Sequence, residues 1–408
     1  MPWLRSFALL LLTAAMASAG DWPQWLGPKR DGSSTEKVAP WKDTLKVLWR
    51  QPVGEGHGSP VVAGGQVFLH VKVKDKDEEE VLAFDVKDGK QVWAHKYARG
   101  NATFKFGNGP RATPTVADGK VYSFGITGIL TCCEAASGKE LWQVDTLKTF
   151  KAPNLFFGVS CSPLIEGDKV LVNVGGMGAS VVAFNKDKGD VVWKAMDDKA
   201  SYSSPIAIGE GKSRQVVFLT QQGLASLSPA DGKVFWKFPL VDKLAESSTT
   251  PVLSGDLLLG SSVTYGAACL KLQDKDGKPA FGEVWKNPAY TCYFSTPVPV
   301  GPDQTYLVTG ALLPPSVMLR CVDTKTGKEH WNKPKIGKYH AALLRTGDDK
   351  LLMLDDAGNL ILLDPNPKEY KELARAKVCG ATWAHPALAN GRVYLRDEKE
   401  LLCIQLGE

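Results

Sequence analysis

The sequence lacks a long apolar run anywhere beyond its N-terminus. No stretch after residue 19 approaches the roughly 20 apolar residues that a membrane-spanning helix needs. The apolar segment 7–15 follows Arg5 and precedes Ala17-Ser18-Ala19, the small-x-small pattern of a signal-peptide cleavage site. We therefore expect residues 1–19 to be a secretory signal peptide cleaved after Ala19, with a retained membrane anchor as the alternative. The mature chain is then exported, to the periplasm or the extracellular space.

Cysteine is absent from the first part of the chain. The first Cys is Cys132, so we expect no N-terminal Cys that could carry a lipid anchor. The scattered His and Cys residues form no His-x-His or Cys-x-x-Cys pair, and no spacing indicates a nucleophile with its base. We therefore predict no metal site and no catalytic residue.

A strong charge of one sign is lacking as well. The formal net charge is +5 over 408 residues, and Lys and Arg are interleaved with Asp and Glu. Because no basic tract stands out, we do not expect a nucleic-acid partner.

What the chain does contain is a repeated stretch that ends on tryptophan. Residues 83–93 read AFDVKDGKQVW, a strand, a Gly turn and a second strand. The pattern returns at residues 132–142, 183–193, 226–236 and 321–331. We interpret its Trp residues, which recur about every 45 residues, as structural anchors: Trp49, Trp93, Trp142, Trp193, Trp236, Trp285 and Trp331.

A Ser/Thr-Pro pair and an alternating apolar strand precede each copy, as at Ser59-Pro60. Each unit thus reads as four short strands joined by turns. Four antiparallel strands per roughly 40–50 residues are typical of a β-propeller blade. The seventh pair has degenerated to Ala341-Ala342 and the eighth reads His385-Pro386. We count eight blades, with seven as the alternative if the seventh copy is misassigned.

The two ends of the chain predict how the ring closes. The last unit stops after its third strand, and the strand 47–50 stands alone before the first unit. The predicted fold is all-β, an eight-bladed propeller of four-stranded antiparallel blades over residues 47–408, in which the N-terminal strand completes the C-terminal blade. We expect residues 20–46, with Trp22 and Trp25, to form an irregular segment packed on the outside or one end of a monomeric propeller.

The pattern Ala-x-Asp-x-x-x-Gly-Lys-x-x-Trp resembles the tryptophan docking motif of the pyrroloquinoline-quinone-type propeller repeats. Ala83, Asp85, Gly89, Lys90 and Trp93 match it position by position, and the resemblance covers essentially the whole mature chain. It implies either a quinoprotein dehydrogenase, with bound quinone (PQQ) and Ca²⁺, or a non-enzymatic propeller similar to the scaffold subunit of the outer-membrane β-barrel assembly machinery. The missing lipid-anchor Cys departs from that subunit.

A vicinal pair, Cys132-Cys133, invites comparison with the Cys pair that lies against the cofactor in some quinoprotein dehydrogenases. Their positions in the repeat argue against that role. When the repeats are aligned, Cys132 falls where the other copies have a small residue such as Ala83, and Cys133 where they have a large apolar residue such as Phe84. We expect both thiols to be buried between blades. Cys161, Cys292 and Cys379 lie near loops, where a disulfide is an open alternative.

The residue three positions before each blade's first Pro forms a ring in the predicted propeller, because it lies in the loop that enters the innermost strand. The eight positions are His57, Arg111, Ser160, Tyr202, Ser248, Phe294, Tyr339 and Trp383. We select His57, Arg111, Tyr202, Tyr339 and Trp383 as candidate ligand-binding residues, since charge and stacking there suit an anionic or aromatic ligand. The alternative is a solvated channel mouth without a ligand.

These observations favour a non-catalytic propeller in the cell envelope that binds an envelope protein or a small ligand and needs no cofactor. The alternative is a PQQ-dependent dehydrogenase that oxidises an alcohol or a sugar. That function requires a carboxylate base, and the ring of eight positions contains none, although Glu55, Asp198 and Glu246 lie close to it in the sequence.

Overall fold

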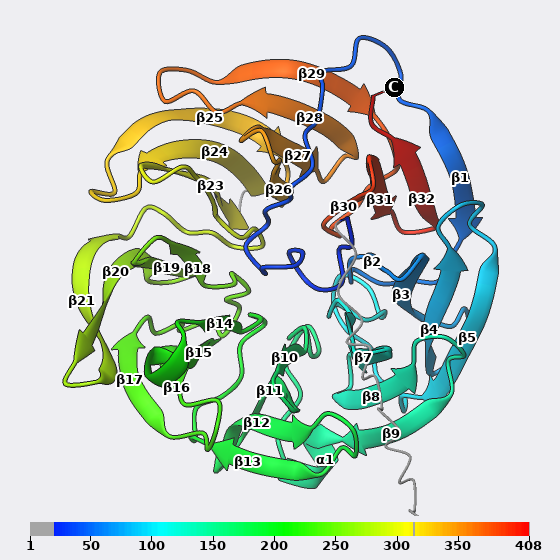
Figure 1. The fold of residues 1–408 in the computed structure, drawn as a ribbon, viewed down its shortest axis with the longest axis vertical. Coiled ribbons are helices and arrows are strands. Elements are labelled where there is room, and N and C mark those ends of the chain that lie inside the picture. Colours follow the sequence, from blue (N-terminus) through cyan, green and yellow to red (C-terminus); the bar gives the residue numbers. More distant parts are fainter. Residues whose placement is uncertain (1–19, 313–314, 408) are drawn as a thin grey trace, which may run out of the picture.

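The computed structural model describes residues 20–312 and 315–407, and the predicted signal peptide lies outside this range. Eight four-stranded sheets, each antiparallel, stand around a central axis like the blades of a propeller (Figure 1). The predicted eight-bladed β-propeller is therefore confirmed. Helices are limited, within the described residues, to α1 (Thr146–Phe150) and the short 3₁₀ turn η1 (Gly211–Ser213). None of the described helices has the length and apolar character to cross a membrane.

Each of the first four blades uses four strands that are consecutive in the sequence. Their bounds are β2 (Val61–Ala63), β3 (Gln66–Lys72), β4 (Glu78–Asp85) and β5 (Gln91–Ala98) in blade 1; β6 (Thr115–Ala117), β7 (Lys120–Phe124), β8 (Ile129–Glu134) and β9 (Glu140–Asp145) in blade 2; β10 (Leu164–Glu166), β11 (Lys169–Gly176), β12 (Ala179–Asn185) and β13 (Val191–Ala195) in blade 3; and β14 (Ile206–Ile208), β15 (Gln215–Thr220), β16 (Gly223–Leu227) and β17 (Val234–Pro239) in blade 4.

The remaining blades follow the same order, with one exception in the last. Their bounds are β18 (Val252–Ser254), β19 (Leu257–Ser262), β20 (Gly266–Lys275) and β21 (Lys278–Asn287) in blade 5; β22 (Val298–Val300), β23 (Gln304–Leu312), β24 (Pro315–Asp323) and β25 (Glu329–Gly337) in blade 6; β26 (Ala341–Arg345), β27 (Leu351–Asp355), β28 (Asn359–Asp364) and β29 (Lys371–Lys377) in blade 7; and β30 (Ala387–Ala389), β31 (Arg392–Arg396), β32 (Glu400–Gln405) and β1 (Val47–Pro52) in blade 8.

Blade 8 joins the two ends of the chain, as the sequence predicts. β1 pairs antiparallel with β32, so that Trp49 lies opposite Cys403 and Pro52 opposite Glu400. This pairing covers the outer edge of the C-terminal sheet with the N-terminal strand and closes the ring.

A β-bulge recurs at the same place in the repeat. In blade 1, Ala83 pairs with Trp93 while Phe84 pairs with Gln91, which leaves Val92 as the extra residue. The same shift follows Cys132 in blade 2 and Ala183 in blade 3. Since the bulge turns the extra residue away from the sheet, Val92 is 48% exposed although it neighbours the buried Trp93.

The tryptophans of the repeat connect neighbouring blades. The indole N–H of Trp93 donates to the carbonyl of Ala135 in blade 2 at 2.9 Å, and its ring lies against Gly138. Indole N–H groups donate to a carbonyl of the following blade in the same way at Trp49, Trp142, Trp193, Trp285 and Trp331. Trp236 differs, because its indole bonds to Gln215 within its own blade and packs on Phe281.

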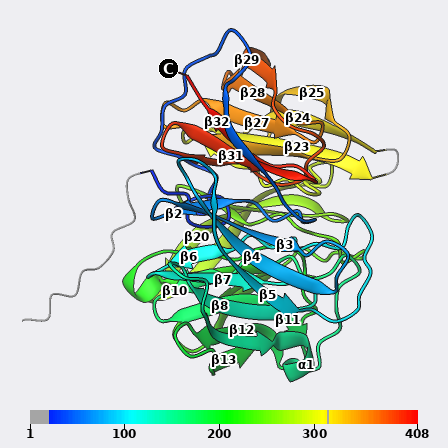
Figure 2. The ribbon, with the colours of Figure 1, turned by 90° about the vertical axis from the view of Figure 1, so that its right-hand side faces the viewer.

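The segment between residue 20 and β1 crosses one end of the central channel (Figure 1), and the side view places its start at one face of the disc (Figure 2). Trp22 is buried and exchanges backbone hydrogen bonds with Val62 of blade 1. The buried guanidinium of Arg30 donates to carbonyls of Pro163 and Pro205 in blades 3 and 4. Farther along, Glu36 accepts from the backbone of blade 8. This segment therefore braces blades on opposite sides of the ring.

Candidate functional site

Hydroxyl groups at the starts of the inner strands form a partial ring of inter-blade hydrogen bonds around the channel, here called the hydroxyl ring. The N–H of Ser59 donates to the hydroxyl of Thr113 at 3.0 Å, that of Thr113 to Ser162 at 2.9 Å, and that of Ser162 to Ser204 at 2.9 Å. The N–H of His385 donates back to Ser59 at 3.0 Å. These Ser and Thr hydroxyls thus satisfy buried backbone donors of the preceding blade.

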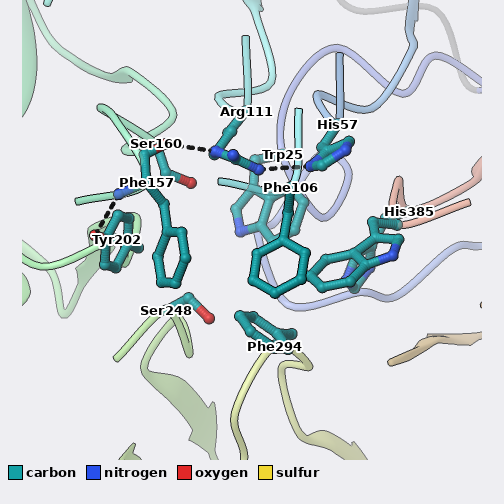
Figure 3. A pocket seen from close by; sticks show the side chains of 11 residues that line it. Trp25, His57, Phe106, Arg111, Phe157, Ser160, Tyr202, Ser248, Phe294 and His385 are labelled. Atoms are coloured by element: carbon teal, nitrogen blue, oxygen red, sulfur yellow. Dashed lines mark hydrogen bonds between the residues drawn. The ribbon is translucent and has the colours of Figure 1, made fainter. Parts of the chain in front are cut away.

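Those loops carry the eight positions that the sequence predicts to form a ring. The structure brings seven of them around one cavity, together with Trp25, Phe106, Phe157 and His385 (Figure 3); the seven are His57, Arg111, Ser160, Tyr202, Ser248, Phe294 and Trp383. Tyr339, the eighth position, is not among the residues that line the cavity. Its ring centroid lies 5.5 Å from that of Trp383.

The cavity is small and largely aromatic. Its volume is about 100 Å³, and its walls include Phe106 against Trp383 at 5.7 Å between ring centroids and Phe294 against Trp383 at 5.0 Å. Trp25 reaches it from the N-terminal segment, and its indole N–H donates to the hydroxyl of Thr250 at 2.8 Å. Phe106 lines the cavity and is 46% exposed, so it lies where the cavity meets solvent.

Arg111 holds the loop of Phe106 in place. Its Nε–H donates to the carbonyl of Phe157 at 2.6 Å, and its Nη2 donates to the carbonyls of Lys105 and Gly107, on either side of Phe106. Its Nη1 donates to Nδ1 of His57 at 2.7 Å. Four of the five guanidinium N–H groups are thus occupied by protein acceptors. Phe106 itself has a φ of +59°, a left-handed conformation that costs a bulky residue about 1–2 kcal/mol.

The histidines around the channel are held neutral. Burial, with Arg111 adding to it, lowers the pKa of His57 to about 3. Burial lowers the pKa of His340 to about 4 and that of His385 well below its ordinary value. Because Nδ1 of His57 accepts from Arg111, its proton lies on Nε2. Burial also lowers the pKa of Arg111 to about 10, which leaves it charged at neutral pH.

The residues of this site do not fit a quinone with Ca²⁺. The cavity wall contains no carboxylate, and the described part of the chain contains no cluster of three His, Cys, Asp or Glu able to hold a metal ion. Ca²⁺ takes six to eight oxygen ligands, mostly from carboxylates and carbonyls. Cofactor pockets usually measure roughly 300–1,000 Å³; this cavity measures about 100 Å³, beside a pocket of about 430 Å³ that shares His57, Phe106 and Trp383 with it.

The cysteines lie elsewhere. Cys132 and Cys133 are buried on β8 in the core of blade 2 and do not line the cavity. All eight cysteines are free thiols, including Cys161, Cys292 and Cys379, for which the sequence leaves a disulfide open.

Sequence reasoning missed four members of the wall, namely Trp25, Phe106, Phe157 and His385. In the repeat, His385 occupies the position that is Ser or Thr in most other blades. Its side chain is larger than theirs and lines the cavity. Phe106 and Phe157 lie in the two long connections that follow β5 and β9. The length of those connections, with aromatics inside Gly-containing segments, is the signal that could have identified them.

Comparison with known proteins shows two groups of relatives. "Outer membrane protein assembly factor BamB" of Burkholderia pseudomallei is 23% identical, over 81% of this chain and 78% of its own length. "Quinoprotein alcohol dehydrogenase PedH" of Pseudomonas putida is 31% identical, over 39% of this chain and 27% of its own length. The chain spans about a quarter to three fifths of the length of the first three curated relatives that it matches.

Solved structures of both groups share the fold. BamB from Moraxella catarrhalis superposes with a TM-score of 0.62 at 16% identity, over 89% of this chain and 98% of its own. Quinohemoprotein alcohol dehydrogenase from Comamonas testosteroni gives 0.67 at 15% identity, over 95% of this chain and 81% of its own. The family model described as "Outer membrane protein assembly factor BamB" matches residues 32–105 and 77–331. A match over most of the chain, on a propeller of this blade pattern, means that the chain belongs to this PQQ-like propeller family.

Proposed function

We propose that the protein is an exported, non-catalytic propeller that acts as a binding scaffold in the cell envelope. The observation that carries this proposal is a set of exposed apolar side chains at the Phe106 end of the channel. Phe156 is 65% exposed, Leu244 58% and Met177 79%. Antiparallel topology places the connection between blades and the hairpin between second and third strands at the same end, so these side chains share one face with Phe106.

Exposed apolar side chains that share one face favour a protein partner. The assembly-factor relatives, which the chain matches over most of its length, support an envelope protein as that partner. The dehydrogenase relatives support the other candidate function. The cavity's lack of carboxylates and its small volume weigh against it.

Affinity capture of the full-length protein from envelope extracts tests the scaffold function. We expect the wild type to retain an envelope protein that a Phe156→Asp/Leu244→Asp double variant loses. The matched control is Val92→Asp/Val192→Asp, which alters two exposed apolar residues of the outer strands β5 and β13 and should retain the same protein.

A second assay separates the two candidate functions. The purified protein is incubated with quinone and Ca²⁺, and dye-linked oxidation of alcohols and sugars is recorded. Turnover would overturn the non-catalytic proposal, whereas capture of the same partner by the wild type and by the Phe156→Asp/Leu244→Asp variant would overturn the proposed surface.

A further inference from the structure

The central cavity has the composition of a ligand site for an uncharged ring. Phe157 and Phe294 face the same space from two different blades (Figure 3), and Trp383 lines it from a third. An apolar cavity of roughly 150 Å³ is known to accept benzene. The space here is about 100 Å³ and is bounded by the partly exposed Phe106. Its volume therefore suits one aromatic ring and no larger group. Offset and edge-to-face contacts with these side chains would hold such a ring.

Charge selects against ions in this space. No carboxylate lines the cavity to neutralise a cation. The one cation in the wall, Arg111, directs four N–H groups to main-chain carbonyls and to His57, so an anion would find its donors already engaged. A charged ligand would therefore lose its hydration without gaining a matched partner.

One polar side chain in the wall is unsatisfied. His385 is 3% exposed, its ring lies 4.6 Å from that of Trp25, and neither of its ring nitrogens has a hydrogen-bond partner among the residues that the structure describes. A neutral imidazole offers one donor and one acceptor. Buried polar groups are nearly always hydrogen-bonded, so this side chain points to a ligand that carries a hydrogen-bonding group.

We propose that the central cavity binds a compact, neutral aromatic molecule of the phenol class, with its ring among Phe157, Phe294 and Trp383 and its hydroxyl on the imidazole of His385. The proposal rests on the non-catalytic function of the site, because the molecule is bound and released unchanged. It does not depend on the exposed face that contacts a protein partner.

Titration calorimetry of the full-length protein with four single-ring probes tests this site. Phenol should bind, toluene should bind at least tenfold more weakly, and benzoate and benzylammonium should not bind detectably. Equal affinity for phenol and toluene, or preferential binding of either ion, would overturn the proposal.

Two variants and a control identify the residues. His385→Leu keeps the apolar volume and removes both nitrogens, so it should weaken phenol at least tenfold and leave toluene within twofold. Ser160→Leu fills the cavity and should abolish binding of both, and it serves as the test if His385→Leu does not fold. Val192→Ala, on the outer strand β13, should bind phenol as the wild type does. Wild-type phenol affinity in both wall variants would overturn the assignment.

The two proposals can fail separately. Phenol that binds and is then oxidised when quinone is added would overturn the non-catalytic function, and recovery of unchanged phenol would support it. Absence of phenol binding together with intact partner capture would overturn the ligand site alone.

Discussion

The indole ring of Trp93 in blade 1 lies directly against the Cα of Gly138 in blade 2. A Cβ at Gly138 would come within 2.4 Å of the ring, and its φ is +72°. The glycine thus meets two requirements at once, a left-handed turn and the close approach of a neighbouring blade.

Gly138→Ala and Gly119→Ala separate these two requirements. Gly119 has a φ of +74° with nothing within 4 Å of the added Cβ, so its substitution should cost only the backbone term of about 1–2 kcal/mol. Gly138→Ala should cost about 1–3 kcal/mol more, because it also overpacks the Trp93 contact. Urea unfolding of both variants measures the difference, and equal losses would contradict it.

The hydroxyl ring makes a prediction about Ser162. Ser162→Ala removes the acceptor of the buried Thr113 N–H, which should lower the free energy of unfolding by about 1–3 kcal/mol. Ser162→Thr should be far closer to the wild type, since Thr occupies this position in blade 2. A loss in the Thr variant as large as in the Ala variant would show that packing, not the hydroxyl, decides.

Stability should respond to pH through Glu79. Its carboxyl is fully buried, accepts from the Tyr97 hydroxyl at 2.6 Å and from the N–H of Ile126 in the next blade at 3.1 Å, and lies 3.5 Å from His70. Burial raises the pKa of Glu79 to about 7 from an ordinary 4.5. The stability it contributes is therefore full below about pH 4.5 and is lost as the pH rises through 7.

Glu79→Gln should remove this dependence. Between about pH 5 and pH 8 the wild type should lose on the order of 2 kcal/mol relative to the variant. Burial also lowers the pKa of His70 to about 3 from an ordinary 6.5. The stability that neutral His70 contributes is therefore lost as the pH falls below 6.5, in the wild type and in the variant alike. Denaturant unfolding across this range gives the comparison, with the exposed Glu283→Gln as control. Parallel curves for the wild type and Glu79→Gln would refute the assignment.

Arg111 should control the mobility of the Phe106 loop. Lys cannot reproduce the planar set of hydrogen bonds that Arg111 makes to Phe157, Lys105 and Gly107. Arg111→Lys should therefore raise amide exchange in the loop around Phe106, while the strands of blade 5 stay protected. Exchange that is unchanged in this loop would mean that the Phe106 conformation is held by packing alone.

The sequence predicts the structure well in the repeated parts of the chain and less well in the parts that do not repeat. The spacing of Trp93 and its counterparts determined the blades, and the lone strand at Trp49 indicated the closure. The loop positions before each inner strand follow from the register, which is why seven of eight reach one cavity. Phe106, Phe157 and Trp25 lie outside the repeat, and their positions depend on how two long connections and the N-terminal segment fold over the channel, which no periodicity encodes.

The chemistry of the site could not be predicted from the sequence, because it depends on which groups are already hydrogen-bonded. The sequence shows Arg111 as a charge in a ring of aromatic residues and so suggests an anion. Only the structure shows its N–H groups bonded to the chain itself. The unsatisfied nitrogens of His385 are likewise visible only once its neighbours are known.

The pairing of β1 with β32 has a consequence for the order in which the molecule assembles. During synthesis Val47 emerges long before its partner Ile404, and the contact of Glu36 with the backbone of blade 8 must also wait. Strand β1 therefore stays unpaired until the last strand is made, and such late, long-range closure is slow. An export system that delivers the chain N-terminus first would deliver every blade before the ring could lock.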